Sequence, residues 1–340
     1  MPIPGQGVVP TGDLYLELTA TTRRAFIPRL FVQMYFATPT WFYLMGGAQR
    51  AGGGLSQITI PIQGQSMVQG QFTGYSGGFN SPMITPGITN AQFPLAYWVV
   101  PIPLPFGETV LQATDREISI LKARMNDAYA VTVQNLAPLI FSNNTGNSLL
   151  PNSFLDAFDN GVNFPIYGGV SRSAPMTRSW AGQYYNAAAI TTGFTRKTMS
   201  NFIIRISDAA GGEAPTFGLM NPSDYAILND DFVGIEQIFT RPGNQFTMDT
   251  PVRTSFPNLN VAGVPIFADH FCPAGHMFFV NTKYTNLFLS EDAAFDFSGF
   301  YSLVPLGQIG QQGVVVLGYN IVTAKPVANA WITGFKGGAW

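Results

Sequence analysis

The strongest structural signature of the chain is the stretch GGGLSQITIPIQGQSMVQGQFTGYSGGFNSPMITPGITNAQF, residues 52–93. It lies within 57 consecutive residues, 51–107, that contain no Asp, Glu, Lys or Arg, and Arg50 and Glu108 bracket this segment. Exposed loops of soluble proteins usually carry charge, whereas surfaces covered by another chain are depleted of it. We therefore predict that this segment lies against neighbouring chains.

Both ends of this stretch alternate in the manner of β-strands. Residues 57–63 place Ile58, Ile60 and Ile62 on one face. Residues 93–100 are predicted to alternate in the same way, with Phe93, Leu95, Tyr97 and Val99 on one face. Two strands joined by a long loop predict an extended β-hairpin over 49–106 that is unstable by itself. The alternative is a flexible linker, because Gly, Ser and Gln dominate the middle of the segment.

A predicted hairpin of this kind would make contacts between subunits at its tip and its base. The tip residues expected to lie on adjacent subunits are Met67, Phe72, Tyr75 and Phe79. Arg50 and Glu108 are expected to frame the base of the loop. Arg23 and Arg24 are expected to pair with acidic residues of a neighbour, because two arginines do not make a basic tract for nucleic acid.

Residues 114–141, TDREISILKARMNDAYAVTVQNLAPLIF, have the period of an amphipathic helix. Thr114 and Glu117 stand at capping-box spacing at its start, and Pro138 disturbs its last turn. The helix would be about 42 Å long at 1.5 Å per residue. Its apolar stripe consists of Ile118, Leu121, Met125, Tyr129, Val133, Leu136 and Ile140. Such a helix could serve as the spine of the subunit.

The rest of the chain alternates short apolar runs with Gly and Pro in an α+β manner. Helices are predicted over 196–211 and over 223–231, the second capped by Ser223. Residues 277–290 predict two strands around a turn at 281–283, and residues 314–323 predict another strand. No internal repeat is visible. We interpret the body as one mixed α+β unit of two subdomains.

Composition excludes several classes of protein. Only 11% of the 340 residues are charged, and the formal net charge is -2, so a basic nucleic-acid reader is disfavoured. The single cysteine excludes an internal disulfide framework and any multi-cysteine metal site. The first 24 residues lack the pattern of a secretory signal, and four prolines interrupt the most apolar stretch, 93–106. We expect neither secretion nor a membrane span.

The densest candidate for chemistry is DHFCPAGH at 269–276. It brings together Asp269, His270, Cys272 and His276, which include both histidines and the only thiol. The spacing matches no zinc pattern, and a Pro-Ala-Gly turn intervenes. We interpret this segment as a turn into the next strand, with a metal site or a Cys-His nucleophile as the alternative. No catalytic residue, cofactor or metal is predicted.

The order of these pieces resembles the major capsid (coat) proteins of tailed bacteriophages, whose fold is shared with herpesvirus capsid proteins. LTATTRRAFIPRL followed by TPTWFYL is similar to the N-terminal arm of that family, and residues 52–93 are similar to its extended loop. FSNNTGN after the long helix, FDNGVNFPIYGGVSRS, GLMNPSDYAIL and VAGVPIFADHFCPAGHMFFVNTKYTNLFL are similar to later segments. The resemblance covers about residues 15–335.

This resemblance implies an α+β fold with an N-terminal arm at 1–48 and an extended β-hairpin loop at 49–106. It also implies a peripheral domain with a spine helix at 107–144 and 276–310, and an axial domain at 145–275 and 311–340. The expected function is that of a structural subunit that assembles into hexamers and pentamers of an icosahedral shell around double-stranded DNA. No enzymatic activity is expected.

The resemblance also implies partners and a location. Portal, scaffolding and possible decoration proteins are the expected partners, together with weak, sequence-independent contact with packaged DNA and no membrane. The location is the virion, after assembly in the host cytoplasm. Some members of the family cross-link through a loop lysine, but this chain has no lysine before Lys122, so a non-covalent shell is expected.

Two other functions remain open from the sequence. A phage tail-tube or other self-assembling tubular protein would also be poor in charge, but the long helix at 114–141 argues against it. A β-rich hydrolase would have to use the 269–276 turn.

Overall fold

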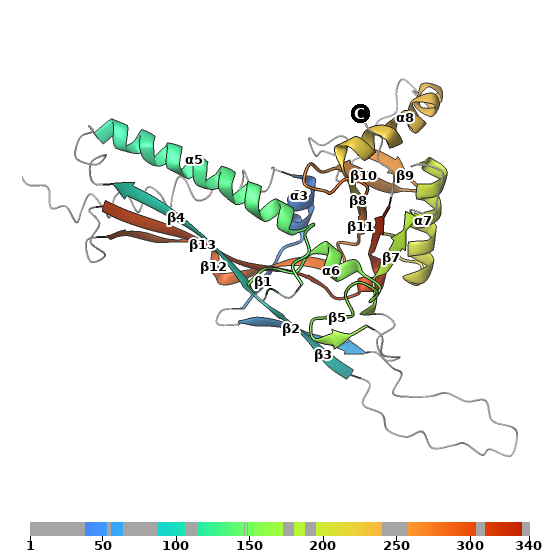
Figure 1. Cartoon of the computed structure of the whole chain (residues 1–340), viewed down its shortest axis with the longest axis horizontal. Coiled ribbons are helices and arrows are strands. Elements are labelled where there is room, and N and C mark those ends of the chain that lie inside the picture. The colour runs from blue at the N-terminus through green and yellow to red at the C-terminus, as the bar shows by residue number, and fades with distance from the viewer. Residues whose placement is uncertain are drawn as a thin grey trace, which may run out of the picture.

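A computed structural model shows how the predicted elements assemble, and it describes residues 38–52, 56–63, 88–105, 114–145, 147, 149–172, 180–187, 195–239, 258–303 and 310–334. The described part is elongated, with a long sheet and helix at one end and a second sheet flanked by helices at the other (Figure 1). The predicted α+β class is confirmed.

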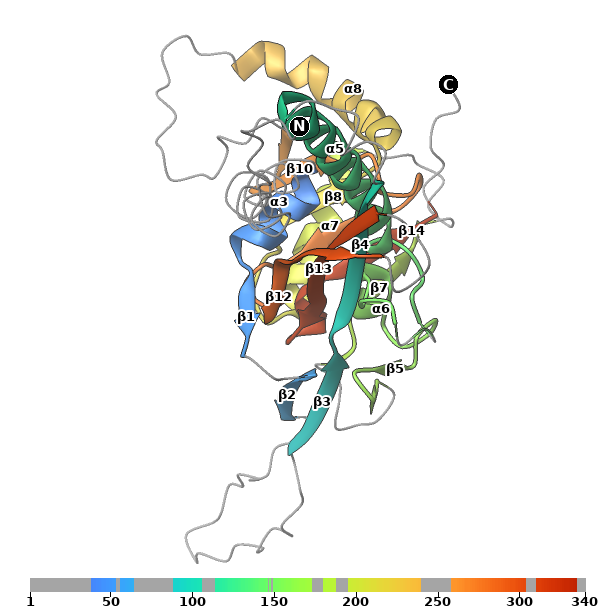
Figure 2. The same ribbon diagram turned by 90° about the vertical axis from the view of Figure 1, so that its left-hand side faces the viewer.

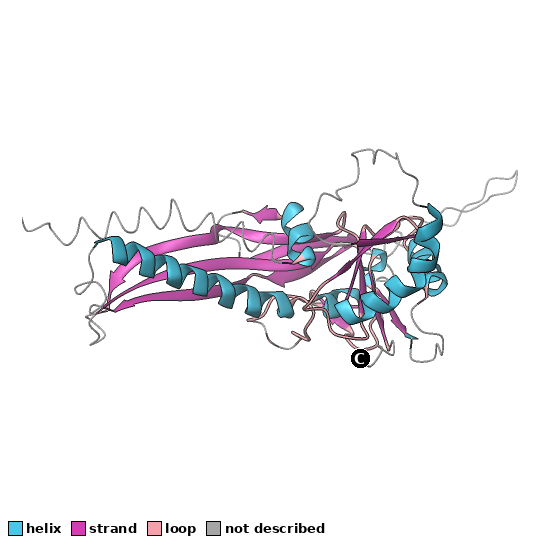
Figure 3. Ribbon diagram, turned by 90° about the horizontal axis from the view of Figure 1, so that it is seen from above, coloured by secondary structure: helices cyan, strands magenta, loops and turns pink. Residues whose placement is uncertain are grey.

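The first sheet is built on two long antiparallel strands, β12 (Thr285–Ser302) and β13 (Gly310–Thr323). Its strand order is β1-β12-β13-β4, where β1 (Gln49–Ala51) runs parallel to β12 and β4 (Ala96–Pro105) runs antiparallel to β13. Residue pairs such as Thr285 with Thr323 and Ser302 with Gln311 mark the two ends of the β12–β13 ladder. This ladder forms the long axis of the molecule (Figure 3).

One long helix, α5 (Thr114–Leu139), runs along this sheet and packs against β4 (Figures 1 and 3). The helix predicted over 114–141 is therefore confirmed. At its C-terminal end the side chain of Asn144 donates hydrogen bonds to the carbonyl oxygens of Leu139 and Pro151, both at 2.8 Å. These bonds satisfy a carbonyl that the end of the helix leaves without a partner. They also fix the turn that follows the helix.

The extended hairpin consists of β2 (Gln57–Gln63) and β3 (Ile88–Pro94), which pair antiparallel from Gln57 opposite Pro94 to Gln63 opposite Ile88. The predicted strand at 57–63 is confirmed, with Ile58 and Ile62 buried and Ile60 partly buried on the face that was expected. Figure 2 shows this hairpin leaving the body at the end of the molecule opposite α8 (Pro222–Phe239).

The alternation predicted over 93–100 is wrong after Leu95. Phe93 and Leu95 are buried, but Tyr97 and Val99 are 54% and 51% exposed. Leu95 lies between β3 and β4 and donates its backbone N–H to Ser56, so the phase of the chain changes there. Ala96, Val100, Ile102 and Leu104 of β4 are therefore the buried set. A change of one residue in register moves every later side chain to the opposite face.

The second sheet has six strands in the order β7-β14-β11-β8-β10-β9. Its strands are β7 (Gln183–Asn186), β8 (Phe217–Met220), β9 (Asn258–Val261), β10 (Val264–Ala268), β11 (Met277–Val280) and β14 (Ala330–Thr333). Helices α7 (Arg196–Ala209) and α8 pack against it (Figure 1). Met199, Phe202, Ile203 and Ile206 of α7 enter a core with Met220, Ile266 and Phe279.

Several smaller predictions can be compared with these elements. The helix predicted over 196–211 is confirmed as α7, and the strands at 277–290 and 314–323 are confirmed as β11, β12 and β13. The predicted cap at Ser223 is wrong, because α8 begins one residue earlier. The side chain of Asn221 accepts the N–H of Ser223 at 3.0 Å and replaces it as the capping group.

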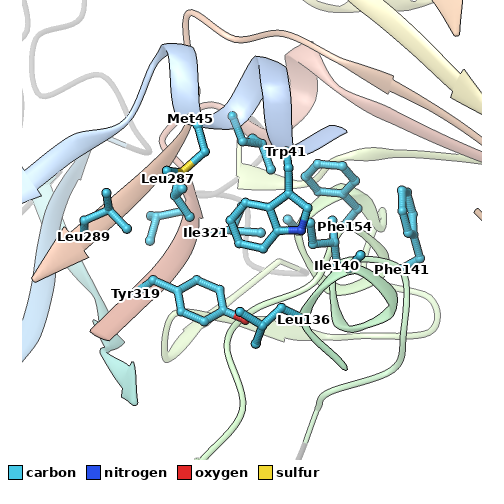
Figure 4. Close-up of a cluster of buried hydrophobic side chains, with 14 of the residues drawn as sticks. Trp41, Met45, Leu136, Ile140, Phe141, Phe154, Leu287, Leu289, Tyr319 and Ile321 are labelled. Carbon is cyan, nitrogen blue, oxygen red and sulfur yellow. The ribbon is translucent and has the colours of Figure 1, made fainter. Parts of the chain in front are cut away.

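The two sheets meet at a shared hydrophobic core (Figure 4). This core receives Trp41 and Met45 from α3 (Pro39–Gly46), and Phe154 from α6 (Phe154–Phe158). The other labelled members are Leu136, Ile140, Phe141, Leu287, Leu289, Tyr319 and Ile321. Because Leu136 and Ile140 come from the predicted stripe of the long helix, the last turns of α5 anchor the helix at this junction. The division into arm, loop, peripheral and axial domains stays a prediction.

Candidate assembly interface

The root of the extended hairpin is held by a second, very short hairpin, β5 (Ile166–Tyr167) and β6 (Val170–Ser171). The backbone N–H of Gln92 donates to the carbonyl of Gly168 at 2.9 Å. Gly168 has a φ of +59°, a conformation that glycine adopts without steric penalty. The two hairpins are thus joined through both backbone and side chains, and this joint sets the direction in which the long hairpin leaves the body.

Three aromatic side chains fill this root. The ring of Phe93 from β3 lies 4.9 Å from that of Tyr167 and 6.3 Å from that of Trp180, measured between centroids. All three side chains are about 1% exposed. The indole N–H of Trp180 donates to the carbonyl of Tyr167 at 3.0 Å, and the Tyr167 hydroxyl accepts the N–H of Thr323 at 3.1 Å. The root is therefore tied directly to the long strand β13.

A buried arginine holds the segment that carries this root. The guanidinium of Arg172 donates to the carbonyl oxygens of Asp159 at 2.9 Å and Phe164 at 3.4 Å, and it lies 4.9 Å from the centre of the Tyr167 ring. It also donates to the carbonyls of Asp156 and Ala157 in α6. Burial lowers the pKa of Arg172, while the nearby carboxylates favour its charged form. The arginine thus satisfies the carbonyl end of α6.

The carboxylate of Asp159 organises the neighbouring loop. It accepts the backbone N–H groups of Gly161 at 2.8 Å and Phe164 at 2.9 Å, and the side-chain amide of Asn163 at 2.8 Å. Arg172 lies 3.9 Å from it, and both side chains are fully buried. Because a buried charge is stable only when paired and hydrogen-bonded, these contacts keep residues 159–172 in one conformation.

Among the described residues, the face of the long sheet that carries Tyr97 and Val99 is exposed. Tyr97 pairs with Gly318 and Val99 with Val316 in the β4–β13 ladder. Pro101 and Pro103 continue the same exposed row, and Tyr301 of β12 is 45% exposed near its far end. Contiguous exposed apolar side chains of this kind mark protein interaction sites.

Only one of the predicted contact residues lies within the described part of the chain. Arg50 is exposed on β1, opposite Leu289 of β12, so it is available to a neighbour. Glu108, Met67, Phe72, Tyr75, Phe79, Arg23 and Arg24 lie outside the described residues. The contacts expected of all eight stay predictions.

The 269–276 segment forms the predicted turn before β11. Asp269 is buried and accepts hydrogen bonds from the hydroxyl of Thr40 and from the N–H of Phe271. Cys272 is buried, and burial raises the pKa of its thiol well above the usual value, so the thiolate needed for nucleophilic attack is disfavoured. His276 accepts the indole N–H of Trp331 at 3.0 Å, while His270 is exposed.

Two kinds of feature are absent from the described part of the chain. Within it, no three His, Cys, Asp or Glu side chains gather where they could hold a metal ion. Among the same residues, no helix combines the length and the apolar character needed to cross a membrane.

Sequence reasoning missed the residues that hold the hairpin root. Tyr167, Gly168 and Arg172 stand in FPIYGGVSRS, where no periodic pattern distinguishes them. One signal was present: Arg172 is an isolated charge in an apolar, glycine-rich context, and a buried arginine in such a context needs partners.

The fold of this chain is similar to the folds of several solved structures. The chain is similar to the capsid of cyanophage A-1(L), with a TM-score of 0.63 at 16% identity, covering 88% of this chain and 93% of that chain. It is also similar to the SrpI encapsulin complex of Synechococcus elongatus PCC 7942, with a TM-score of 0.54 at 10% identity, covering 89% and 90%. The capsid of a native GTA particle gives 0.53 at 13% identity, covering 86% and 89%.

No protein-family model and no curated protein sequence matches the chain. The structural similarity extends over nearly the whole length of each chain and establishes the fold: the chain has the fold of bacteriophage major capsid proteins. The resemblance seen in the sequence is confirmed at this level.

Proposed function

We propose that the chain is the major capsid subunit of a tailed bacteriophage and that it assembles into hexamers and pentamers of an icosahedral shell around double-stranded DNA. The observation that carries this proposal is the extended hairpin. The hairpin strands β2 and β3 leave the body from the root described above. They belong to a segment that has no charged residue between Arg50 and Glu108. A hairpin of this kind gains stability when a neighbouring subunit covers it.

The open face of the long sheet supports the same proposal. Tyr97 and Val99 expose apolar surface on β4, and the second strand of the hairpin, β3, ends immediately before β4. Each copy would thus offer both a projecting arm and an apolar surface, as subunits in a closed lattice require. The similarity to the cyanophage capsid over 93% of that chain supports this assignment.

The tubular alternative receives less support. A helix of 26 residues runs along the sheet, and α7 and α8 flank the second sheet, so helices make up much of the described fold. The structures to which the chain is similar are named as capsids and an encapsulin complex.

The shell is proposed to be held without covalent links between subunits. Residues 49–106 contain no lysine, so the extended loop cannot supply an amine for an isopeptide bond. Portal, scaffolding and decoration proteins are the proposed partners. The virion is the proposed location, after assembly in the host cytoplasm, and contact with DNA is proposed to be weak and independent of sequence.

Sedimentation of the full chain, compared with a variant lacking residues 66–88, tests this proposal. The full chain, expressed alone or with the scaffolding protein of its phage, should sediment as large particles that dissociate fully in boiling detergent. The deletion variant should stay folded by circular dichroism but fail to assemble. Unimpaired assembly of the deletion variant would contradict the role of the loop. Ladders that survive boiling would contradict the non-covalent shell.

A further inference from the structure

A cavity of about 300 Å³ opens beside the hairpin root, between the end of β3, the turn after α5 and the start of α6. Its lining residues are Pro94, Asn144, Thr145, Asn147, Leu150, Pro151, Asn152 and Asp156. The only charged group among them is the carboxylate of Asp156. The cavity therefore has a mostly apolar lining with one acidic group, and it is adjacent to the element that we propose to engage neighbours.

The half-buried side chain of Asp156 has one carboxylate oxygen that lacks the partner a buried polar atom requires. Its Oδ1 atom is buried and has no hydrogen-bond partner among the described residues. Asp159, by contrast, accepts three backbone N–H groups and one side-chain amide. Arg172 acts electrostatically on Asp156, but its hydrogen bonds go to four carbonyl oxygens and its close ion pair is with Asp159.

The charges at this site do not balance. Two carboxylates, Asp156 and Asp159, face the single guanidinium of Arg172, and no other charged group among the described residues acts on Asp156. Burial raises the pKa of Asp156 to about 6, with Arg172 opposing the rise and Asp159 adding to it. Among the described residues, this site is short of one positive charge.

The walls of the cavity are preformed. The side chain of Asn144 donates to the carbonyls of Leu139 and Pro151, and the backbone N–H of Asn152 donates to the side chain of Asn320 at 2.8 Å. Leu150 and Pro151 add apolar wall. An apolar wall that leads to a carboxylate suits a long basic side chain, whose aliphatic stem packs while its charged end pairs.

The sequence indicates where such a side chain comes from. Residues 18–107 contain four arginines, Arg23, Arg24, Arg29 and Arg50, and no acidic residue. This stretch must find its counter-charges elsewhere, and it includes the extended loop that we propose to lie on neighbours. We propose that the cavity binds an arginine side chain from the 18–107 stretch of a second copy of the chain, which pairs with Asp156. This inference rests on the proposed function.

The substitution Asp156→Asn tests the proposal because it predicts opposite effects in the free subunit and in the shell. In unassembled subunits the melting temperature at pH 7 should rise, by roughly 2–4 °C, because a half-buried carboxylate with one buried, unpartnered oxygen is removed. In assembled particles the same substitution should lower the temperature at which the particles dissociate, or reduce the yield of particles. The reason is that the arginine of the neighbouring copy loses the carboxylate with which we propose it pairs. The matched control is Asp208→Asn, an exposed acid on α7, which should change neither.

A cryo-electron microscopy map of the wild-type particle then identifies the occupant. We expect a guanidinium of another copy within about 3 Å of the Asp156 carboxylate. A metal ion, ordered water or a side chain of the same copy in the cavity would overturn the proposal. Asp156→Asn shells as stable as the wild type would overturn it too, while leaving the capsid function intact. If the wild type forms no particles with its scaffold, the proposed function and this inference both fail.

Discussion

The ring of Phe93 occupies the space that a side chain at residue 168 would need. A Cβ atom added to Gly168 would lie 2.5 Å from Cζ of Phe93, a separation that real Cβ contacts essentially never show. Residue 168 is also held at a positive φ. The hairpin strand and the short β5–β6 hairpin therefore fit together only when this position has no side chain.

The substitution Gly168→Ala should consequently displace Phe93 and loosen the hairpin root. Positive φ alone costs about 1–2 kcal/mol for an L-residue, and the clash adds to it, so we expect a loss of at least about 2 kcal/mol in the free energy of unfolding. Denaturant unfolding of the subunit measures this, and particle yield should fall as well. Gly169→Ala is the matched control, because Gly169 also has a positive φ but has open space around it. Equal losses in the two variants would contradict the account of the root.

The substitution Arg172→Met should destabilise the subunit more than the replacement of any exposed charged residue would. The change removes the donor to four carbonyl oxygens and leaves Asp159 buried without its cation, for which about 3–5 kcal/mol is expected. Thermal unfolding followed by circular dichroism measures the effect. Lys197→Met on the exposed surface of α7 is the control and should stay within about 0.5 kcal/mol of the wild type. A similarly small effect at Arg172 would contradict the role assigned to its contacts.

The edge of the long sheet should resist pairing with other strands. Pro101 and Pro103 lie two residues apart on β4, which among the described strands of this sheet pairs only with β13, so their missing N–H groups weaken the outer edge as a template. The double substitution Pro101→Val, Pro103→Val should therefore promote aggregation, measured by light scattering during refolding. Replacing both by Lys should not, because edge charges protect in the same way. Equal solubility of the Val and wild-type proteins would argue against a protective role.

Acid should weaken the packing of the second sheet through His276. This ring accepts the indole N–H of Trp331, and burial lowers its pKa below the ordinary value. At acidic pH the unfolded chain therefore binds a proton at His276 that the folded chain does not bind. The stabilising contribution of neutral His276 to the free energy of unfolding is present above about pH 6.5, and it is lost as the pH falls through the pKa of His276 in the folded chain. The carboxyl groups of Asp156, Asp224 and Asp269 have pKa values raised by desolvation and act in the opposite direction.

The contribution of His276 is isolated by comparing the pH dependence of unfolding between the wild type and His276→Asn. The difference in unfolding free energy between them should shrink as the pH is lowered from 7.5 to 5. A wild-type profile that His276→Asn does not alter would show that this hydrogen bond carries no pH sensitivity.

Local periodicity was enough to predict the elements whose burial follows a simple pattern. The stripe that includes Leu136 and Ile140 marked the long helix, and Ile58 and Ile62 marked the first hairpin strand. The phase change at Leu95 could not be predicted, because it depends on the contact of Leu95 with Ser56 and on the pairing of β4 with β13, two hundred residues away. Pairing between strands so far apart in the sequence produces no pattern within a few consecutive residues.

The same limit applies to the candidate interface. Absence of charge over 51–107 identified the segment that we propose to contact neighbours, since that property is local. The root that orients it combines Phe93, Gly168, Trp180 and Arg172, which only the tertiary fold brings together. The sequence could not predict that an oxygen of Asp156 lacks a hydrogen-bond partner, because this depends on the groups that the tertiary fold places around it.

Electron microscopy of the purified 340-residue chain, assembled with its scaffolding protein, decides whether the protein is a shell subunit. We expect closed shells built of hexamers and pentamers, with residues 64–87 of each copy lying on an adjacent copy. Open-ended tubes, or a monomer that forms no particles under any condition that supports scaffold binding, would contradict it.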